Sequence, residues 1–235
     1  MCDNIVEKKL KTRSAELIKM KKNLKLNLMQ KKVLPGILLG DAYLYTQDSG
    51  KTYFLHIYQS EKHKEYVFHL YELFKEWCLS TPKTIEHTYK SKVYKGKKAT
   101  MISFKTISSV SFRFYAQIFT SKDKDINKTN TVNLTKKVPK LIHRWLTPIS
   151  IAYWFMDDGS IKDKKSKAVY FNTQKFSLQQ VNLLCDILNS KFNLIAKPVK
   201  KKEKYQIYIS GKSYETLTNL IYPYLIKDML YKFPT

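Results

Sequence analysis

The sequence has few cysteines, few glycines and no long apolar run. Its 3 cysteines, Cys2, Cys78 and Cys185, lie far apart and form no Cys-x-x-Cys pair. A zinc site or disulfide framework is therefore not indicated, and a reducing compartment is expected. Glycine is scarce at 6 residues, whereas there are 17 tyrosines and 12 phenylalanines, which favours strands and packed helices over long flexible loops. No apolar run reaches the roughly 18 residues that a membrane span needs, so we expect no membrane partner.

Acidic residues are also few, and their shortage indicates the partner. The chain has 19 Asp and Glu against 43 Lys and Arg, a net charge of +24. A field of this sign attracts polyanions, above all nucleic acid, because neutralised phosphates release counterions. An A+T-rich genome also enriches lysine, but it does not account for so few acids. Residues 1–33 are interpreted as a basic lead-in and not as a transit peptide, because Asp3, Glu7 and Glu16 interrupt them.

An internal repeat organises the rest of the chain. At a constant offset of 117 residues, identical residues coincide: Asp41 with Asp158, Tyr53 with Tyr170, and Ser60 with Ser177. Apolar positions of the segments that follow coincide as well. Self-similarity of this kind indicates two copies of one structural unit. We therefore divide the chain into a first repeat, 34–146, and a second repeat, 147–235.

Each repeat is predicted to form helix, two strands, helix, two strands, helix, which is an α+β fold with one sheet per repeat. The first helices are expected at 34–41 and 149–158, the latter with Thr147 and Pro148 as N-cap and first turn. β-branched and aromatic runs predict strands at 52–58, 100–105, 168–173 and 205–209. Further helices should start near Ser60, Ser111, Ser177 and Ser213. With helices on one face of each sheet, the other face is free to bind a partner.

Residues in and beside the strand hairpins are the candidates for that binding. Basic residues interleaved with tyrosine on a two-stranded ribbon suit the major groove of DNA. For any single lysine a solvated charged surface is the simpler interpretation, but for the whole set we favour DNA contact. The candidate DNA-binding residues are Lys51, Tyr53, Lys92, Lys95, Lys97, Lys98, Lys105, Asn172, Lys200, Lys201, Lys202 and Lys204.

Two aspartates stand at matched places, each at the C-terminal end of an apolar helix. That end carries partial negative charge and unsatisfied carbonyls, so an acid there is unfavourable unless a cation lies beside it. Carboxylate and carbonyl oxygens are the ligands that Mg²⁺ takes. If the two helices pack side by side, Asp41 and Asp158 form a paired metal site able to stabilise the attacking and leaving oxygens of a phosphodiester. Two strands of duplex DNA would then meet one aspartate each.

The sequences around these aspartates resemble the two motifs of LAGLIDADG homing endonucleases of the single-chain, two-repeat type. Gly36-Ile-Leu-Leu-Gly-Asp41-Ala-Tyr43 is similar to the first motif, and Leu146-Thr-Pro-Ile-Ser-Ile-Ala-Tyr-Trp-Phe-Met-Asp-Asp-Gly159 to the second. The resemblance implies two pseudo-symmetric αββαββα repeats, each with a saddle-like antiparallel sheet for DNA, in a monomer. It also implies Mg²⁺-dependent cleavage of both strands at a long asymmetric DNA site, with Mn²⁺ as a substitute cation, in the service of intron mobility.

The resemblance further assigns site residues. Asp41 and Asp158 would be metal ligands, and Gly40 and Asp157 would offer backbone carbonyls. Lys232 would lie near the cleavage centre of the second repeat. In the first repeat the alignment with the family favours Lys136, whereas the repeated Lys-apolar-Pro pattern favours Lys137, so both stay candidates. Polar neighbours of the metals are expected at Gln59 and Gln174.

A second function and the origin of the gene also follow from the resemblance. Some members of the family assist the splicing of their host intron, so an RNA maturase that binds intron RNA is the alternative. Retention of both aspartates favours the nuclease. The bias to Lys, Asn and Tyr is typical of an A+T-rich organelle genome, and we expect a mitochondrial or chloroplast gene product.

Overall fold

The computed structural model describes residues 15–88, 96, 98–122, 134–163 and 165–234. After α1 (Ala15–Asn23), the first repeat runs α2 (Leu28–Leu39), β1 (Tyr43–Tyr45), β2 (Phe54–Ser60), α3 (Lys64–Phe74), β3 (Lys83–Thr88), β4 (Lys98–Lys105) and α4 (Arg113–Phe119). A hairpin of β5 (Thr120–Lys122) and β6 (Leu134–Lys136) follows. The second repeat runs α5 (Pro148–Asp158), β7 (Gly159–Ile161), β8 (Val169–Phe171), α6 (Leu178–Phe192), β9 (Ala196–Lys201), β10 (Lys204–Ile209) and α7 (Tyr214–Ile221).

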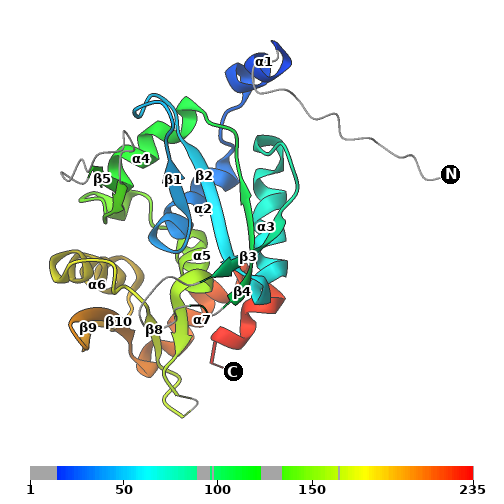
Figure 1. The fold of residues 1–235 in the computed structure, drawn as a ribbon. Coiled ribbons are helices and arrows are strands. Elements are labelled where there is room, and N and C mark those ends of the chain that lie inside the picture. The colour runs from blue at the N-terminus through cyan, green and yellow to red at the C-terminus, as the bar shows by residue number, and fades with distance from the viewer. Residues whose placement is uncertain (1–14, 89–95, 97, 123–133, 164, 235) are drawn as a thin grey trace.

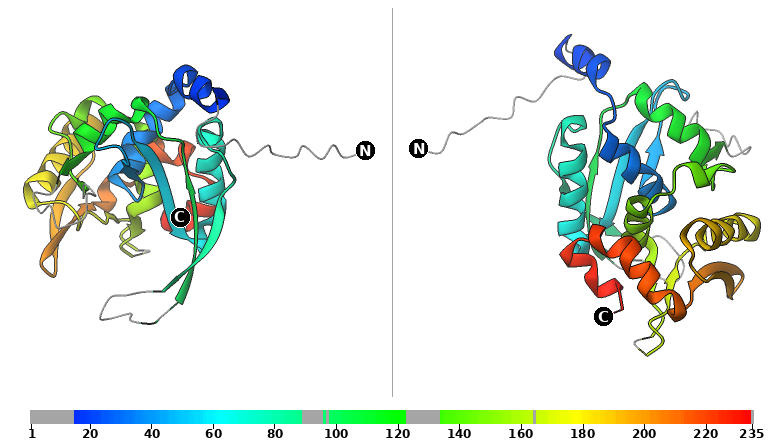
Figure 2. Two further views of the ribbon diagram at one scale, coloured as in Figure 1. Left: turned by 45° about the horizontal axis from the view of Figure 1, so that its top comes forward. Right: turned by 180° about the vertical axis from the view of Figure 1, so that it is seen from behind.

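Each repeat contributes one antiparallel sheet of the same topology. The strand orders are β1-β2-β4-β3 and β7-β8-β10-β9, and together with the helices they confirm the predicted αββαββα duplication (Figure 1). The β3 and β4 strands form a long hairpin that reaches away from the body of the molecule (Figure 2). Within the described residues, no helix is long and apolar enough to cross a membrane.

Capping residues fix where the helices begin. Thr147 accepts a hydrogen bond from the Ser150 N–H and Pro148 opens α5, as predicted. Ser177 forms the predicted capping box with Gln180 at the start of α6. Asn27 forms a capping box that was not foreseen, so α2 begins at Leu28 inside the segment interpreted as a lead-in.

The two motif helices α2 and α5 pack against each other at the centre of the molecule (Figure 1). A Cβ atom on Gly36 would lie 2.1 Å from the carbonyl oxygen of Ser150, so only glycine permits this approach. The bulk of Tyr153 is directed away from this contact: its hydroxyl hydrogen-bonds His69 of α3 at 2.7 Å. Trp154 packs on Phe171 within the core of the second repeat, with ring centroids 4.4 Å apart. The large residues therefore leave the helices in close contact.

Alternation along the strands separates a core face from an open face in each sheet. On β2, Leu55 and Ile57 are buried against the helices, whereas His56 and Tyr58 lie on the opposite, partly exposed face. On β10, Ile207 and Ile209 face the core, and Tyr208 lies on the open face. Because the helices cover the core face of each sheet, only the open face is available to bind a partner.

Candidate active site

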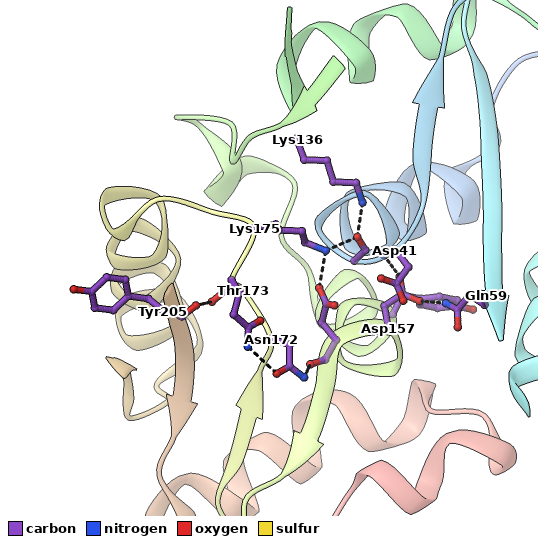
Figure 3. Close-up of polar contacts among 12 residues, drawn as sticks. Asp41, Gln59, Lys136, Asp157, Asn172, Thr173, Lys175 and Tyr205 are labelled. Atoms are coloured by element: carbon purple, nitrogen blue, oxygen red, sulfur yellow. Dashed lines mark hydrogen bonds and ion pairs between the residues drawn. The ribbon is translucent and has the colours of Figure 1, made fainter. Parts of the chain in front are cut away.

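The two aspartates come together because their helices end side by side. Asp158 is the last residue of α5, and Asp41 follows α2 directly after its C-cap, Gly40. The backbone N–H of Asp41 donates to Oδ2 of Asp157 at 3.0 Å, which ties the end of the first motif to that of the second (Figure 3). A Cβ on Gly40 would lie 2.1 Å from the same Oδ2. Glycine is therefore required where the two motif ends meet.

The half-buried Asp157 side chain accepts hydrogen bonds from residues of the first repeat. Its Oδ1 accepts a hydrogen bond of 2.9 Å from Gln59 Nε2, and Gln59 Oε1 in turn lies 2.8 Å from Nδ1 of His63. Burial and the charge of Asp41 raise the pKa of Asp157 to about 8, against the opposing effect of the hydrogen bond from Asp41. Of the two predicted glutamines, Gln59 thus lies at the site.

Lys136 and Lys232 occupy matched places around the motif ends. Lys136 Nζ donates to the Gly40 carbonyl, and Lys232 Nζ donates to the carbonyls of Met156 and Asp157 at 2.5 and 2.8 Å. Gly40 and Asp157 coincide at the repeat offset of 117, so Lys136 is the counterpart of Lys232. Burial and the neighbouring Lys175 lower the pKa of Lys136 to about 7.

Lys137, the other candidate, is placed elsewhere. It lines a surface hollow of about 670 Å³ together with residues of α4 and α6, such as Gln117 and Leu183. The Lys-apolar-Pro pattern matches Lys137 with Lys232, whereas the structural counterpart of Lys232 is Lys136, one residue earlier. Side chains of successive residues on an extended segment point to opposite sides, so that one residue decides which lysine reaches the site.

Lys175, which the sequence did not single out, lies at the centre of the site. Its Nζ is 3.0 Å from Oδ2 of Asp158 and donates to the Gly40 carbonyl at 2.6 Å (Figure 3). Burial raises the pKa of Asp158, and the charge of Lys175 opposes that rise. Lys175 lies in the connection between β8 and α6, where no periodic pattern distinguishes a lysine that points inward from a solvated one.

Asn172 and Gln174 form hydrogen bonds within the protein that support the end of the second motif. Asn172 donates from its backbone N–H and its side-chain Nδ2 to the Asp158 carbonyl, at 2.9 and 2.8 Å. Its Oδ1 accepts from Gln206 Nε2 at 2.6 Å and from Gln174 Nε2 at 3.3 Å. Asn172 was predicted as a DNA-binding residue, but its amide is committed to holding Asp158 in place.

The open sheet faces contain only part of the predicted DNA-binding set. Lys105 pairs with His56 on the open face of the first sheet, and Lys204 has the same parity as Tyr208 on the second. Tyr53 was predicted wrongly: it is 5% exposed, since it shares the parity of the buried Leu55.

Several other lysines of the set lie away from the open faces or in loops. By alternation, Lys98 and Lys200 belong to the opposite faces of their strands, and Lys98 forms an ion pair with Glu86. Lys51 lies in an exposed loop, where its carbonyl accepts a hydrogen bond from Arg113, and Lys202 lies in the β9–β10 turn. Lys201 pairs with Lys204 and lies on the open side. Three remaining candidates fall outside the described residues: Lys92, Lys95 and Lys97.

Aromatic rings, more than lysines, line the open face of the first sheet. Contacts between ring centroids of 5.7–6.1 Å connect neighbouring members of a series of rings: Tyr43, Tyr45, Phe54, His56, Tyr58 and His87. On the second sheet, the amines of Lys162 and Lys197 lie 5.7 and 5.6 Å from the Tyr208 ring centroid. The strand alternation of the sequence carried a signal for these residues, but only the observed register identifies the open face.

The donor atoms at the motif ends suit a hard divalent cation. The Asp158 carboxylate and the Gly40 carbonyl lie close enough to share the Lys175 ammonium, and Asp41 and Asp157 hold the corresponding places of the other repeat. All of these donors are oxygen atoms, the ligands of Mg²⁺ and Mn²⁺. Among the described residues no group of three or more His, Cys, Asp and Glu side chains could hold a metal. A cation here would therefore depend on carbonyls, water and a bound phosphate for the rest of its shell.

Comparison with known sequences gives consistent results. A family model described as the LAGLIDADG DNA endonuclease family matches residues 31–217. The chain is 33% identical over 211 residues to probable intron-encoded endonuclease 1 of Wickerhamomyces canadensis, covering 88% of this chain and 84% of that protein. It is 30% identical over 214 residues to DNA endonuclease I-ChuI of Chlamydomonas applanata, covering 88% and 95% of the two. Cytochrome b mRNA maturase bI2 of Saccharomyces cerevisiae is 33% identical over 141 residues, which are 59% of this chain and 31% of the maturase.

The fold also matches a solved structure. The homing endonuclease I-WcaI bound to its DNA recognition sequence is similar to this chain with a TM-score of 0.81 and 31% sequence identity. The match covers 95% of this chain and 94% of that one. It therefore includes both sheets and the two motif helices.

Proposed function

Because the chain belongs to the LAGLIDADG DNA endonuclease family, we propose that it is a homing endonuclease that cuts both strands of a long, asymmetric DNA site and thereby promotes the mobility of the intron that encodes it. The observation that carries the proposal is the placement of Asp41 and Asp158 at adjoining ends of α2 and α5, with lysine amines on the carbonyls beside them. Both repeats lie in one chain, so a monomer brings one aspartate to each DNA strand.

Mg²⁺ is the cation that we propose for the site, with Mn²⁺ as a substitute. When bound, it would activate water and neutralise charge on the scissile phosphates. Asp41 and Asp158 would hold it with their carboxylates, helped by the carbonyls of Gly40 and Asp157. The amines of Lys136 and Lys232 donate hydrogen bonds to those carbonyls. Their positive charge would stabilise the negative charge that develops on the scissile phosphate during cleavage.

The open sheet faces would contact the DNA on either side of the cleavage centre. Lys105, Lys204 and Lys197 supply charge for phosphates, and the aromatic series from Tyr43 to His87 supplies flat apolar surface for base edges. The relatives named as intron-encoded endonucleases support a gene carried within an intron. We propose an organelle genome as its location, as the Lys, Asn and Tyr bias of the sequence suggests.

Substitution of each aspartate tests the proposal. Asp41→Asn and Asp158→Asn should each abolish double-strand cutting of a plasmid that contains the uninterrupted exon junction, while duplex binding measured by gel shift is retained. Asp186→Asn, an exposed acid of α6, is the matched control and should cut as the wild type does. Full double-strand cutting by either motif variant would refute the assignment.

An RNA maturase is the second candidate function, favoured by the 33% identity to the yeast cytochrome b mRNA maturase. That match covers only 31% of the maturase, whereas the matches to named endonucleases extend over most of both chains. A splicing assay of the host intron, with and without the protein, separates the two. Splicing that depends on the protein and survives both aspartate substitutions would establish maturase activity independent of cleavage.

A further inference from the structure

Lys175 connects the two repeats at the motif ends. It belongs to the second repeat, and its Nζ contacts a carboxylate oxygen of the second motif, Asp158 Oδ2 at 3.0 Å, and the backbone carbonyl of Gly40 in the first motif at 2.6 Å (Figure 3). The ion pair is the most buried of those in the described residues: the Lys175 and Asp158 side chains are 27% and 11% exposed, whereas the other pairs are 41% exposed or more. Partial burial strengthens such a pair relative to one in full contact with water.

The other aspartate has no such partner. Within the described part of the chain, the Asp41 carboxylate forms no ion pair and no side-chain hydrogen bond; only its backbone N–H is engaged, with Asp157. Lys232, the lysine beside that centre, donates to the backbone carbonyls of Met156 and Asp157 and not to a carboxylate. The two carboxylates therefore differ in direct contact: Asp158 touches an amine, whereas the charges of Lys136 and Lys232 act on Asp41 without an ion pair.

An ammonium group and a divalent cation compete for the same oxygen atoms. Lys175 Nζ lies between a carboxylate oxygen and a carbonyl oxygen, which are ligands that a hard cation requires. The two positive charges repel each other at this separation, so a cation on Asp158 requires the amine to move. At the Asp41 centre Lys232 contacts the Asp157 carbonyl but no carboxylate oxygen, so a cation can bind the Asp41 carboxylate before that amine moves.

We propose that Lys175 is a built-in competitor for the divalent cation at the Asp158 and Gly40 oxygens, so that the Asp41 centre binds its cation more tightly and the two DNA strands are cut in order. The proposal rests on the endonuclease function proposed above. Lys175 is a positioning residue in this scheme: it holds the motif ends of the two repeats together and delays loading of one centre. At limiting cation the enzyme nicks one strand and the nicked duplex accumulates.

The direct test is a cation titration of Lys175→Gln, which keeps the length of the side chain and removes its charge. Mn²⁺ is titrated into the protein bound to its already cleaved DNA product, and free Mn²⁺ is counted by electron paramagnetic resonance, so that no turnover is involved. The wild type should show two sites of unequal affinity. Lys175→Gln should tighten the weaker site by about three- to tenfold, the range of a modest ion pair, and leave the tighter one unchanged.

Two further variants control the result. Lys140→Gln changes an exposed lysine that lines the surface hollow with Lys137; it makes the same change in net charge and should alter neither site. Lys175→Arg keeps the charge and should keep the inequality of the sites, so the proposal stays testable if Lys175→Gln proves unstable in thermal melting. Two equal sites in the wild type, or an unchanged weaker site in a folded Lys175→Gln protein, would overturn the proposal.

Plasmid cleavage supplies a second readout and separates this inference from the function on which it rests. At low Mn²⁺ the wild type should accumulate nicked circles, and Lys175→Gln should convert supercoiled plasmid to linear product with less nicked intermediate. A wild type that cuts no duplex in any cation would remove the proposed function, while the Mn²⁺ titration, repeated on the protein without DNA, would still decide the role of Lys175. Loss of cleavage in Lys175→Gln at saturating Mn²⁺ would instead make Lys175 a catalytic residue and contradict the competitor role.

Discussion

Replacement of Gly40 by alanine tests how closely the two motif ends are packed. The backbone φ of Gly40 is −81°, outside the left-handed region, and the close approach of Asp157 leaves no room for a Cβ there. A Cβ would lie 2.1, 2.5 and 2.6 Å from Oδ2, Cβ and Cγ of Asp157. Ordinary contacts are about 3.5–4.0 Å, so the overlap exceeds roughly 1 Å and α2 and α5 must move apart.

The expected cost has two parts. Overpacking of a close contact costs about 1–3 kcal/mol. Separation of the helix ends also breaks the part-buried hydrogen bond from the Asp41 N–H to the Asp157 carboxyl, which adds about 1–3 kcal/mol. The free energy of unfolding of Gly40→Ala should therefore fall by about 2–6 kcal/mol, or roughly 4–24 °C in Tm for a chain of this size.

Urea unfolding and plasmid cleavage measure the two consequences of Gly40→Ala. Double-strand cutting should drop sharply, since Asp41 moves with the end of α2. Asp157→Gly removes the three clashing atoms, so the double variant Gly40→Ala, Asp157→Gly should lose less than the sum of the two single losses. If Gly40→Ala is as stable as the wild type, or more stable, the close approach of the motif ends is wrong.

Three further predictions concern pH, the Asp157 carboxyl and the DNA face. The pKa of Lys136 falls from 10.5 in the unfolded chain to about 7 in the folded one. Between these pH values the unfolded state binds more protons, so the free energy of unfolding should rise with pH. Urea unfolding at pH 7 and 9 should show a smaller rise in this free energy for Lys136→Met than for the wild type. Asp157, with its pKa raised to about 8, is largely neutral at pH 7, so Asp157→Asn should cost less than about 1 kcal/mol, whereas Asp157→Ala should cost about 2–4 kcal/mol; equal losses in thermal melting at pH 7 would contradict this. Lys105→Gln on the open sheet face should weaken duplex binding and reduce the slope of log affinity against log salt by about 1, and Lys98→Gln, on the opposite face, should leave that slope unchanged in titrations followed by fluorescence anisotropy.

Local features of the sequence determined much of the fold. The capping residues Thr147 and Ser177 act through neighbours within three positions, and the structure contains both caps as predicted. The apolar motif helices and the repeat offset led to Asp41 and Asp158, because an acid at a helix C-terminus is unfavourable wherever the rest of the chain lies. Apolar and β-branched runs likewise located the main strands, so the αββαββα order was available before any tertiary contact was known.

The tertiary structure alone decided which side chains meet. Lys175 is an unremarkable loop lysine in the sequence, and its role depends on Gly40, a residue of the other repeat. Lys136 and Lys137 are adjacent and chemically identical, and only the path of the chain directs the first into the site. Tyr53 and His56 are both polar aromatics of one strand region, but strand alternation buries the first and places the second on the partly exposed open face. Composition and spacing do not encode these choices, because a shift of one residue in register exchanges the two faces of a strand, and the register is set by packing across the whole molecule.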